Sequence, residues 1–132
     1  NSQIGKQEKV DKWTKYGKLT NPYKYFEIEF KEYDGGKIYR VSFQNMKYTE
    51  ITDICSFQFE ATDDELKYLK QTLLDGCAIK KGSEDITLEI GNGMIQLQYL
   101  SGKNVRMWYI EDGKVAKRTW LSAKQIDKLF KV

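Results

Sequence analysis

The segments ATDDELKYL (61–69) and LSAKQIDKL (121–129) share one sequence pattern at positions sixty residues apart. In both, a hydroxyl residue, Thr62 or Ser122, precedes a Glu or Gln by three positions. This spacing is that of a capping box, in which two side chains satisfy free backbone amides at the start of a helix. The sequence therefore predicts two helices that begin with the same signal.

The residues on either side of each box complete a repeated unit. Residues 56–60 and 117–121 precede the boxes and have the alternating polarity or the aromatic and β-branched content of strands. An internal repeat and a chance recurrence of a common residue pair both fit this pattern. Apolar residues follow the boxes at helical spacing, so each helix is expected to lie on a sheet. They are Leu66, Leu69 and Leu73 in one helix and Ile126, Leu129 and Phe130 in the other.

Further strands are expected from short alternating segments joined by glycine turns. In the first half, residues 25–31 and 37–43 flank a hairpin turn at 34–36. The helix in this half, about 63–75, is expected to end at Gly76 as a left-handed C-cap. The second half predicts a four-strand meander before the closing helix, with strands at about 86–90, 94–100, 105–110 and 115–121.

These elements predict an α+β fold. If residues 13–19 add a strand, each half of the chain has the order ββββα. Short strands joined by tight turns form antiparallel sheets, and helices that follow runs of strands pack on them. We expect an antiparallel sheet built from two units, each a strand meander followed by a helix (ββββα-like). Both helices are expected to pack on one face of this sheet. The other face would then be accessible to a ligand.

Length and charge predict one domain preceded by a basic arm. The 132 residues fit a single domain, and no stretch has the apolar length of a membrane span. Lysines recur at every third position from Lys6 to Lys18, which would line one edge of an extended arm, although chain ends are also commonly solvated. We expect a partly ordered arm at 1–22 and the α+β domain at 23–132, with sub-repeats at about 23–76 and 77–132.

The composition argues against several kinds of chemistry. The chain has no His, its two Cys lack a zinc-binding spacing, and no phosphate-binding or nucleophile motif occurs. We therefore predict no catalytic residue, no metal site and no cofactor. Cys55 and Cys77 are either two buried thiols or a disulfide. The protein would be exported if they pair, and cytoplasmic if it binds nucleic acid.

The second half predicts an aromatic and basic sheet face. Apolar residues alternate with polar or large ones along its strands, and placing the apolar series inward leaves six residues outward. Aromatic rings can stack on unpaired bases with roughly 1–3 kcal/mol per base, and cations contact phosphates. Alternatively, the tryptophans close the edge of the core or form a dimer contact. The outward residues are Gln96, Gln98, Arg106, Trp108, Arg118 and Trp120.

The segment LEIGNGMIQLQYLSGKNVRMWYIEDGKVAKRTWLSAKQIDKLF (88–130) resembles the single-stranded-DNA-binding domain of the positive cofactor four family in its order of strands, turns and helix. Two such units in one chain are similar to the Whirly and PUR-type nucleic-acid-binding folds. The resemblance implies a curved sheet that binds unpaired strands through aromatic and basic side chains. Glu27 and Glu29 in the first half depart from it, because cations would be favoured there. The implied residues are Arg106, Trp108, Lys117 and Arg118.

We therefore expect a non-enzymatic domain that binds single-stranded DNA or RNA. Trp108 would stack on bases, and Gln96 and Gln98 would belong to the same site. The alternative is an exported or toxin-neutralising bacterial domain that binds a protein partner, because protein interfaces are enriched in Tyr and Trp. A homodimer is also compatible with the sequence. The expected phosphate contacts are Arg106, Lys117, Arg118 and Arg40.

Overall fold

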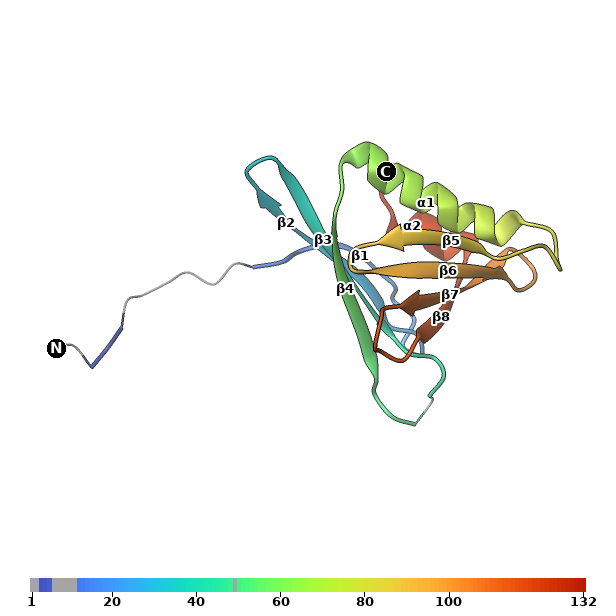
Figure 1. Ribbon diagram of the computed structural model, residues 1–132, viewed down its shortest axis with the longest axis horizontal. Coiled ribbons are helices and arrows are strands. Elements are labelled where there is room, and N and C mark those ends of the chain that lie inside the picture. Colours follow the sequence, from blue (N-terminus) through green and yellow to red (C-terminus); the bar gives the residue numbers. More distant parts are fainter. Residues whose placement is uncertain (1–2, 6–11, 49) are drawn as a thin grey trace.

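The computed structural model describes residues 3–5, 12–48 and 50–132. Within these residues the chain forms eight strands and two helices in the order ββββαββββα (Figure 1). Lys6 and Lys9 of the predicted basic arm lie outside the described residues. The elements are β1 (Thr14–Lys18), β2 (Phe26–Tyr33), β3 (Gly36–Gln44), β4 (Ile54–Glu60), α1 (Asp63–Ala78), β5 (Ile86–Ile90), β6 (Gly93–Tyr99), β7 (Asn104–Ile110), β8 (Lys117–Ser122) and α2 (Ala123–Leu129).

The strands form two antiparallel sheets, with the orders β1-β2-β3-β4 and β5-β6-β7-β8. Each sheet is followed in the chain by a helix, which confirms the predicted α+β class and its two strand-plus-helix units. The β2–β3 hairpin turns at Gly35, whose φ of 101° is a conformation that glycine adopts without strain. In Figure 1 the strands of the first sheet run across those of the second, with α1 along one side of the second sheet.

Both helices begin at the predicted capping boxes. The amide of Glu65 donates to Thr62 Oγ1 at 3.1 Å, and the amide of Thr62 donates to Glu65 Oε1 at 3.0 Å. Ser122 and Gln125 make the same pair of bonds at 3.1 and 3.0 Å. The recurring sequence signal therefore has the same structural outcome at both positions, where it satisfies amides that have no partner within the helix.

The prediction that Gly76 ends the first helix is wrong. Helix α1 continues past it, and its C-cap is Ile79, whose amide donates to the carbonyl of Asp75. Gly76 is buried within the helix, where an added Cβ would lie 2.7 Å from Val105 Cγ2 and 3.3 Å from Leu97 Cβ. The absence of a side chain at this position lets α1 approach β6 and β7 closely.

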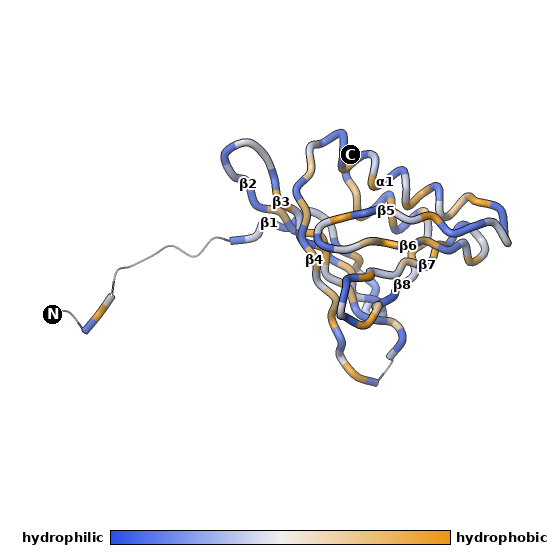
Figure 2. Tube along the Cα trace, in the orientation of Figure 1, coloured by the Kyte–Doolittle hydropathy of each residue, from blue (hydrophilic) through white to orange (hydrophobic). Residues whose placement is uncertain are grey.

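The two units share one hydrophobic core. Helix α1 packs on β6 and β7 of the second sheet, whereas α2 contacts β1 and β8, and the helices contact each other. Between the sheets, the ring of Phe57 on β4 stacks on that of Tyr109 on β7, with centroids 4.2 Å apart and planes 3° from parallel. Figure 2 shows apolar and polar residues interspersed along the strands, as expected for sheets with one buried face. Each unit therefore depends on the other for burial.

Both cysteines are buried free thiols, with 5% of Cys55 and 3% of Cys77 exposed. They lie on β4 and in α1. Burial raises the pKa of each thiol to about 11. In the described part of the chain, neither helix combines the length and apolar character that a membrane-crossing helix needs.

We expect Cys55 and Cys77 to react slowly with a thiol reagent in the native protein at pH 8 and rapidly in denaturant, because the reactive thiolate is disfavoured by burial. Because their pKa values are raised in the folded state, the two protonated thiols contribute to the free energy of unfolding at low pH. This stabilising contribution should be lost as the pH rises from about 9.0 towards about 11. Titration with the thiol reagent, with and without guanidinium chloride, measures the reactivity of the thiols. Melting temperatures between pH 9.0 and 11 measure the loss of stability. A covalent Cys55–Cys77 bond in non-reduced protein would contradict this assignment.

We expect Gly76→Ala to lower the free energy of unfolding by about 1–3 kcal/mol, because crowding of a packed interface outweighs the better helix propensity of Ala. Chemical denaturation measures the change. Lys67→Ala, at an exposed position of α1, is the matched control and should change stability by less than about 0.5 kcal/mol. An unchanged or increased stability of the Gly76 variant would show that α1 is not held against β6 and β7 as described.

Candidate nucleic-acid interface

The second sheet has one face turned away from the core, here named the outer face. Along β6, β7 and β8, buried residues such as Leu97, Met107 and Thr119 alternate with partly exposed ones. The alternation expected from the sequence is therefore present in the structure. The outer face contains Gln96 and Gln98 on β6, Arg106 and Trp108 on β7, and Arg118 and Trp120 on β8.

Strand register arranges these six side chains in two rows. Gln96 lies opposite Trp108, which lies opposite Arg118. In the next row Gln98 lies opposite Arg106, which lies opposite Trp120. On β7 and β8, indole and guanidinium groups therefore alternate both along each strand and across the strand pair. Directly opposite residues in antiparallel strands have Cβ atoms about 4.5–5.5 Å apart, so each indole has a guanidinium as an immediate neighbour.

Arg106 uses only part of its hydrogen-bonding capacity within the protein. Its Nη1 donates to Gln98 Oε1 at 3.3 Å, and its guanidinium carbon lies 5.5 Å from the centre of the Trp108 ring. Its buried Nε has no hydrogen-bond partner among the described residues. A guanidinium group is planar and has five N–H donors, which can form paired hydrogen bonds to an anion such as phosphate. Arg106 is therefore suited to an anionic ligand beside an aromatic ring.

A lysine distant in the sequence supports Trp120. Lys24 is 7% exposed, and its Nζ donates to the carbonyl of Trp120 at 2.7 Å and to Gln125 Oε1 at 3.0 Å. This nitrogen lies 5.8 Å from the centre of the Trp120 ring. Burial lowers the pKa of Lys24. No local sequence pattern identifies Lys24 as a site residue, because the strand that it contacts lies 96 positions later.

Lys117 lies apart from the other predicted site residues. It is opposite Tyr109, whose side chain is buried, so Lys117 belongs to the side of β8 that faces away from Arg118 and Trp108. Its Nζ pairs with Asp53 Oδ1 at 2.8 Å, and Asp53 Oδ2 accepts a hydrogen bond from Asn45 at 2.9 Å. The physical reason is the strand period, which turns adjacent residues to opposite faces. Lys117 therefore joins the loop before β4 to the second sheet.

Arg40 also lies away from the outer face, because it belongs to β3 of the first sheet. Its Nη2 forms an ion pair with Glu29 at 2.8 Å, and its guanidinium carbon lies 4.3 Å from the centre of the Trp13 ring. Lys31 Nζ lies 4.7 Å from the same ring. Arg40 thus occupies a separate aromatic and basic cluster in which a carboxylate already offsets its charge.

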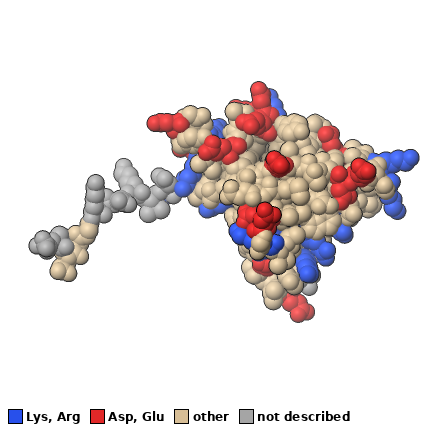
Figure 3. Space-filling model, in the orientation of Figure 1, with Lys and Arg blue, Asp and Glu red and all other residues tan. Residues whose placement is uncertain are grey.

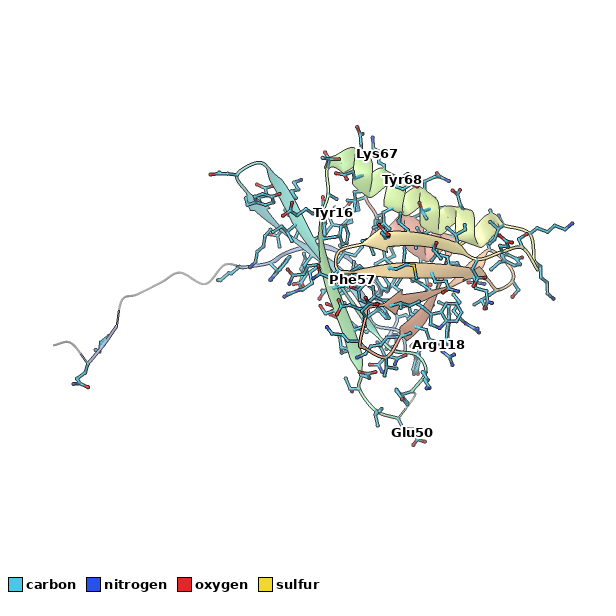
Figure 4. The ribbon with its side chains drawn as sticks, in the orientation of Figure 1. Tyr16, Glu50, Phe57, Lys67, Tyr68 and Arg118 are labelled. Carbon is cyan, nitrogen blue, oxygen red and sulfur yellow. The ribbon has the colours of Figure 1, made fainter. Side chains whose placement is uncertain are left out.

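The outer face has little negative charge. Along β5, Thr87 pairs with Gln96 and Glu89 pairs with Met94, so Glu89 is the one carboxylate that the four strands place on this side. Asp85, just before β5, accepts a hydrogen bond from Gln96 at 2.7 Å. Figure 4 shows Arg118 projecting from the second sheet on the side away from α1, and Figure 3 shows Lys and Arg on that lower right side of the molecule.

The described residues contain no group of three or more His, Cys, Asp or Glu that could hold a metal ion.

Comparisons with protein-family models, with curated proteins and with solved structures found no match to this chain. The likeness to the positive cofactor four, Whirly and PUR-type folds therefore stays a prediction.

We expect Lys117→Met to lower the melting temperature at neutral pH, because it removes the partner of Asp53. The Lys117 ammonium and the Asn45 amide lower the pKa of the Asp53 carboxyl. A lowered pKa contributes stability above the ordinary Asp value of 3.8 and loses it as the pH falls through the folded-state value. The difference between variant and wild type should therefore shrink below about pH 3.8. A difference that is independent of pH would contradict the ion pair.

Proposed function

We propose that this protein binds single-stranded nucleic acid on the outer face of its second sheet and does so without catalysis. The observation that supports this proposal is the alternating arrangement of Arg106, Trp108, Arg118 and Trp120 on two neighbouring strands. Indole rings provide stacking surfaces for bases, and guanidinium groups provide contacts for phosphates. The arrangement therefore matches the alternation of rings and anions along a nucleic-acid strand.

Spacing favours unpaired strands over duplexes. Trp108 and Trp120 are diagonal neighbours on β7 and β8, a relation that separates residues by about 7–8 Å. Stacked bases in a duplex are spaced by about 3.4 Å along each strand and are enclosed between their neighbours. Two bases can reach two indoles at the wider spacing only if they are unstacked from each other. A single strand can adopt that conformation with little cost.

Binding of this kind should depend weakly on sequence. Stacking uses the flat surface that every base has, and phosphate contacts are the same for every nucleotide. Gln96 and Gln98 are the amides of the outer face that could contact base edges, and both already have hydrogen bonds within the protein. We therefore propose a binder of single strands in general, with DNA and RNA both acceptable.

A protein partner is the second candidate, and exposed apolar side chains favour it. Tyr23, Ile51 and Val115 are 86%, 59% and 73% exposed. Tyr is enriched at protein interfaces, where its ring gives contact area at low entropic cost. These residues lie outside the outer face, so a protein partner would contact side chains other than the six of the outer face.

We expect Trp108→Ala to weaken binding to a labelled oligo(dT) by about 1–3 kcal/mol, which is about 5- to 150-fold, through loss of stacking. The double variant Arg106→Ala and Trp108→Ala should abolish binding while melting near the wild-type temperature. Fluorescence anisotropy measures affinity without relying on tryptophan emission. Trp13→Ala, which removes an indole from the other sheet, is the control and should bind as the wild type does. Tight binding by the double variant would refute the proposed surface.

The salt dependence of binding offers a second matched comparison. Arg118→Ala should weaken binding and reduce the salt dependence, because each phosphate contact contributes about −0.7 to the slope of log affinity against log salt for single strands. Lys67→Ala removes a lysine from an exposed position of α1, away from the outer face, so it should keep the wild-type slope. Titrations at several salt concentrations measure both. Equal slopes for the two variants would show that Arg118 does not contact phosphate.

A further inference from the structure

A surface hollow of about 470 Å³ lies where the end of the first sheet meets β8. It is here named the tyrosine hollow, because three tyrosines contribute to its walls. Two of them are well exposed: Tyr23 at 86% and Tyr48 at 39%. None of these residues was singled out from the sequence. The lining of the hollow includes Tyr23, Tyr25, Gln44, Met46, Tyr48 and Ile51.

The wall of the hollow is joined to the outer face at Arg118. The amide of Met46 donates to the carbonyl of Arg118 at 2.8 Å, and the amide of Arg118 lies 3.3 Å from its acceptor, Asn45 Oδ1. The side chain of Arg118 belongs to the outer face, beside Trp108. The backbone of Arg118 is therefore bonded directly to Met46, a residue that lines the hollow.

Hydrogen bonds hold the segment that forms the hollow. Gln44 Nε2 donates to the carbonyl of Ile51 at 3.1 Å, and the amide of Asn45 donates to the carbonyl of Asp53 at 2.7 Å. Asp53 is in turn paired with Lys117 of β8. The two ends of this loop are thus fixed to each other and to the second sheet, so that Met46 and Tyr48 keep their position relative to Arg118.

Lysines lie beside two of the tyrosine rings. Lys47 Nζ is 5.7 Å from the centre of the Tyr48 ring, and Lys18 Nζ is 6.0 Å from that of Tyr25. The hollow also has one carboxylate, Glu50, in its lining. Flat aromatic surfaces with an ammonium group nearby suit a ligand that joins a planar ring to an anionic group. A nucleotide unit has this combination.

We infer that the tyrosine hollow binds one unpaired base of a strand that is already held on the outer face, with Lys47 near the adjoining phosphate. This inference rests on the proposed function and extends it by a second subsite. The strand would pass from Trp108 over Arg118 and reach Tyr48 at the wall of the hollow. Longer oligonucleotides should then bind more tightly than those that only cover the outer face.

The test compares a short and a long oligo(dT) by fluorescence anisotropy. Wild-type protein should gain affinity with length, and Tyr48→Ala should lose about 5- to 150-fold on the long oligonucleotide while binding the short one normally. Tyr48→Phe should behave as the wild type, because the ring and not the hydroxyl is required. Tyr68→Ala removes a tyrosine that is 64% exposed on α1 and is the matched control. Equal binding of the long oligonucleotide by Tyr48→Ala and wild type would overturn the inference.

The outcomes separate the subsite from the proposed function. If the short oligonucleotide binds and depends on Trp108, but Tyr48 has no effect, only the hollow is refuted, and a protein partner then becomes the better ligand for it. If no oligonucleotide of either length binds the wild type, the proposed function and the subsite both fail. Should Tyr48→Ala unfold the protein, Tyr23→Ala provides the same test at a side chain that is 86% exposed.

Position along the strand gives an independent measurement. A 5-iodouracil base placed near one end of the long oligo(dT) should crosslink on irradiation to Tyr23, Met46 or Tyr48, whereas one placed centrally should crosslink to Trp108. Peptide mass spectrometry identifies the attached residue. Crosslinks at Trp108 from both positions, with none in the hollow, would overturn the inference while leaving the outer face as the binding surface.

Discussion

The burial of one side of β7 decides what the rest of the second sheet can do. Val105, Met107 and Tyr109 are buried and face the core, since α1 packs on β7 and Tyr109 stacks on Phe57 of the first sheet. The strand period of two then forces Arg106 and Trp108 outward. A slip of one residue would exchange the two sets, so the energy of the core also sets the register of the outer face. The candidate interface is thus a consequence of packing on the opposite side.

The first sheet supports this face from its edge. Lys24 bonds to the carbonyl of Trp120, and Met46 and Asn45 bond to the backbone of Arg118, so the outer edge of β8 is occupied by the end of the first sheet. Polar groups of β8 that would otherwise be unpaired at a sheet edge are satisfied in this way. The same contacts place the tyrosine hollow next to Arg118. The contacts between β8 and the end of the first sheet therefore stabilise the fold and connect the two proposed subsites.

Much of the local structure could be predicted from the sequence. Both capping boxes, the alternating strands and the glycine turns act over a few residues, so their outcome depends on neighbours in the chain. The outward direction of Gln96, Gln98, Arg106, Trp108, Arg118 and Trp120 followed from the same short-range alternation. Gly76 could not be interpreted in this way. It lies in close contact with Val105, a residue of a strand that comes much later in the chain, so its role depends on tertiary packing.

What the sequence by itself determined is the order of elements, the two helix starts and the alternation of core and outer side chains along β6 to β8. Only the tertiary structure decided that α1 packs on the second sheet, that Lys117 pairs with Asp53 and that Arg40 lies on the other sheet with Trp13. It alone brought Lys24 to Trp120 and the tyrosine hollow to Arg118. The reason is physical: local signals act through nearby backbone atoms, whereas contacts between distant segments arise only when both sheets share one core.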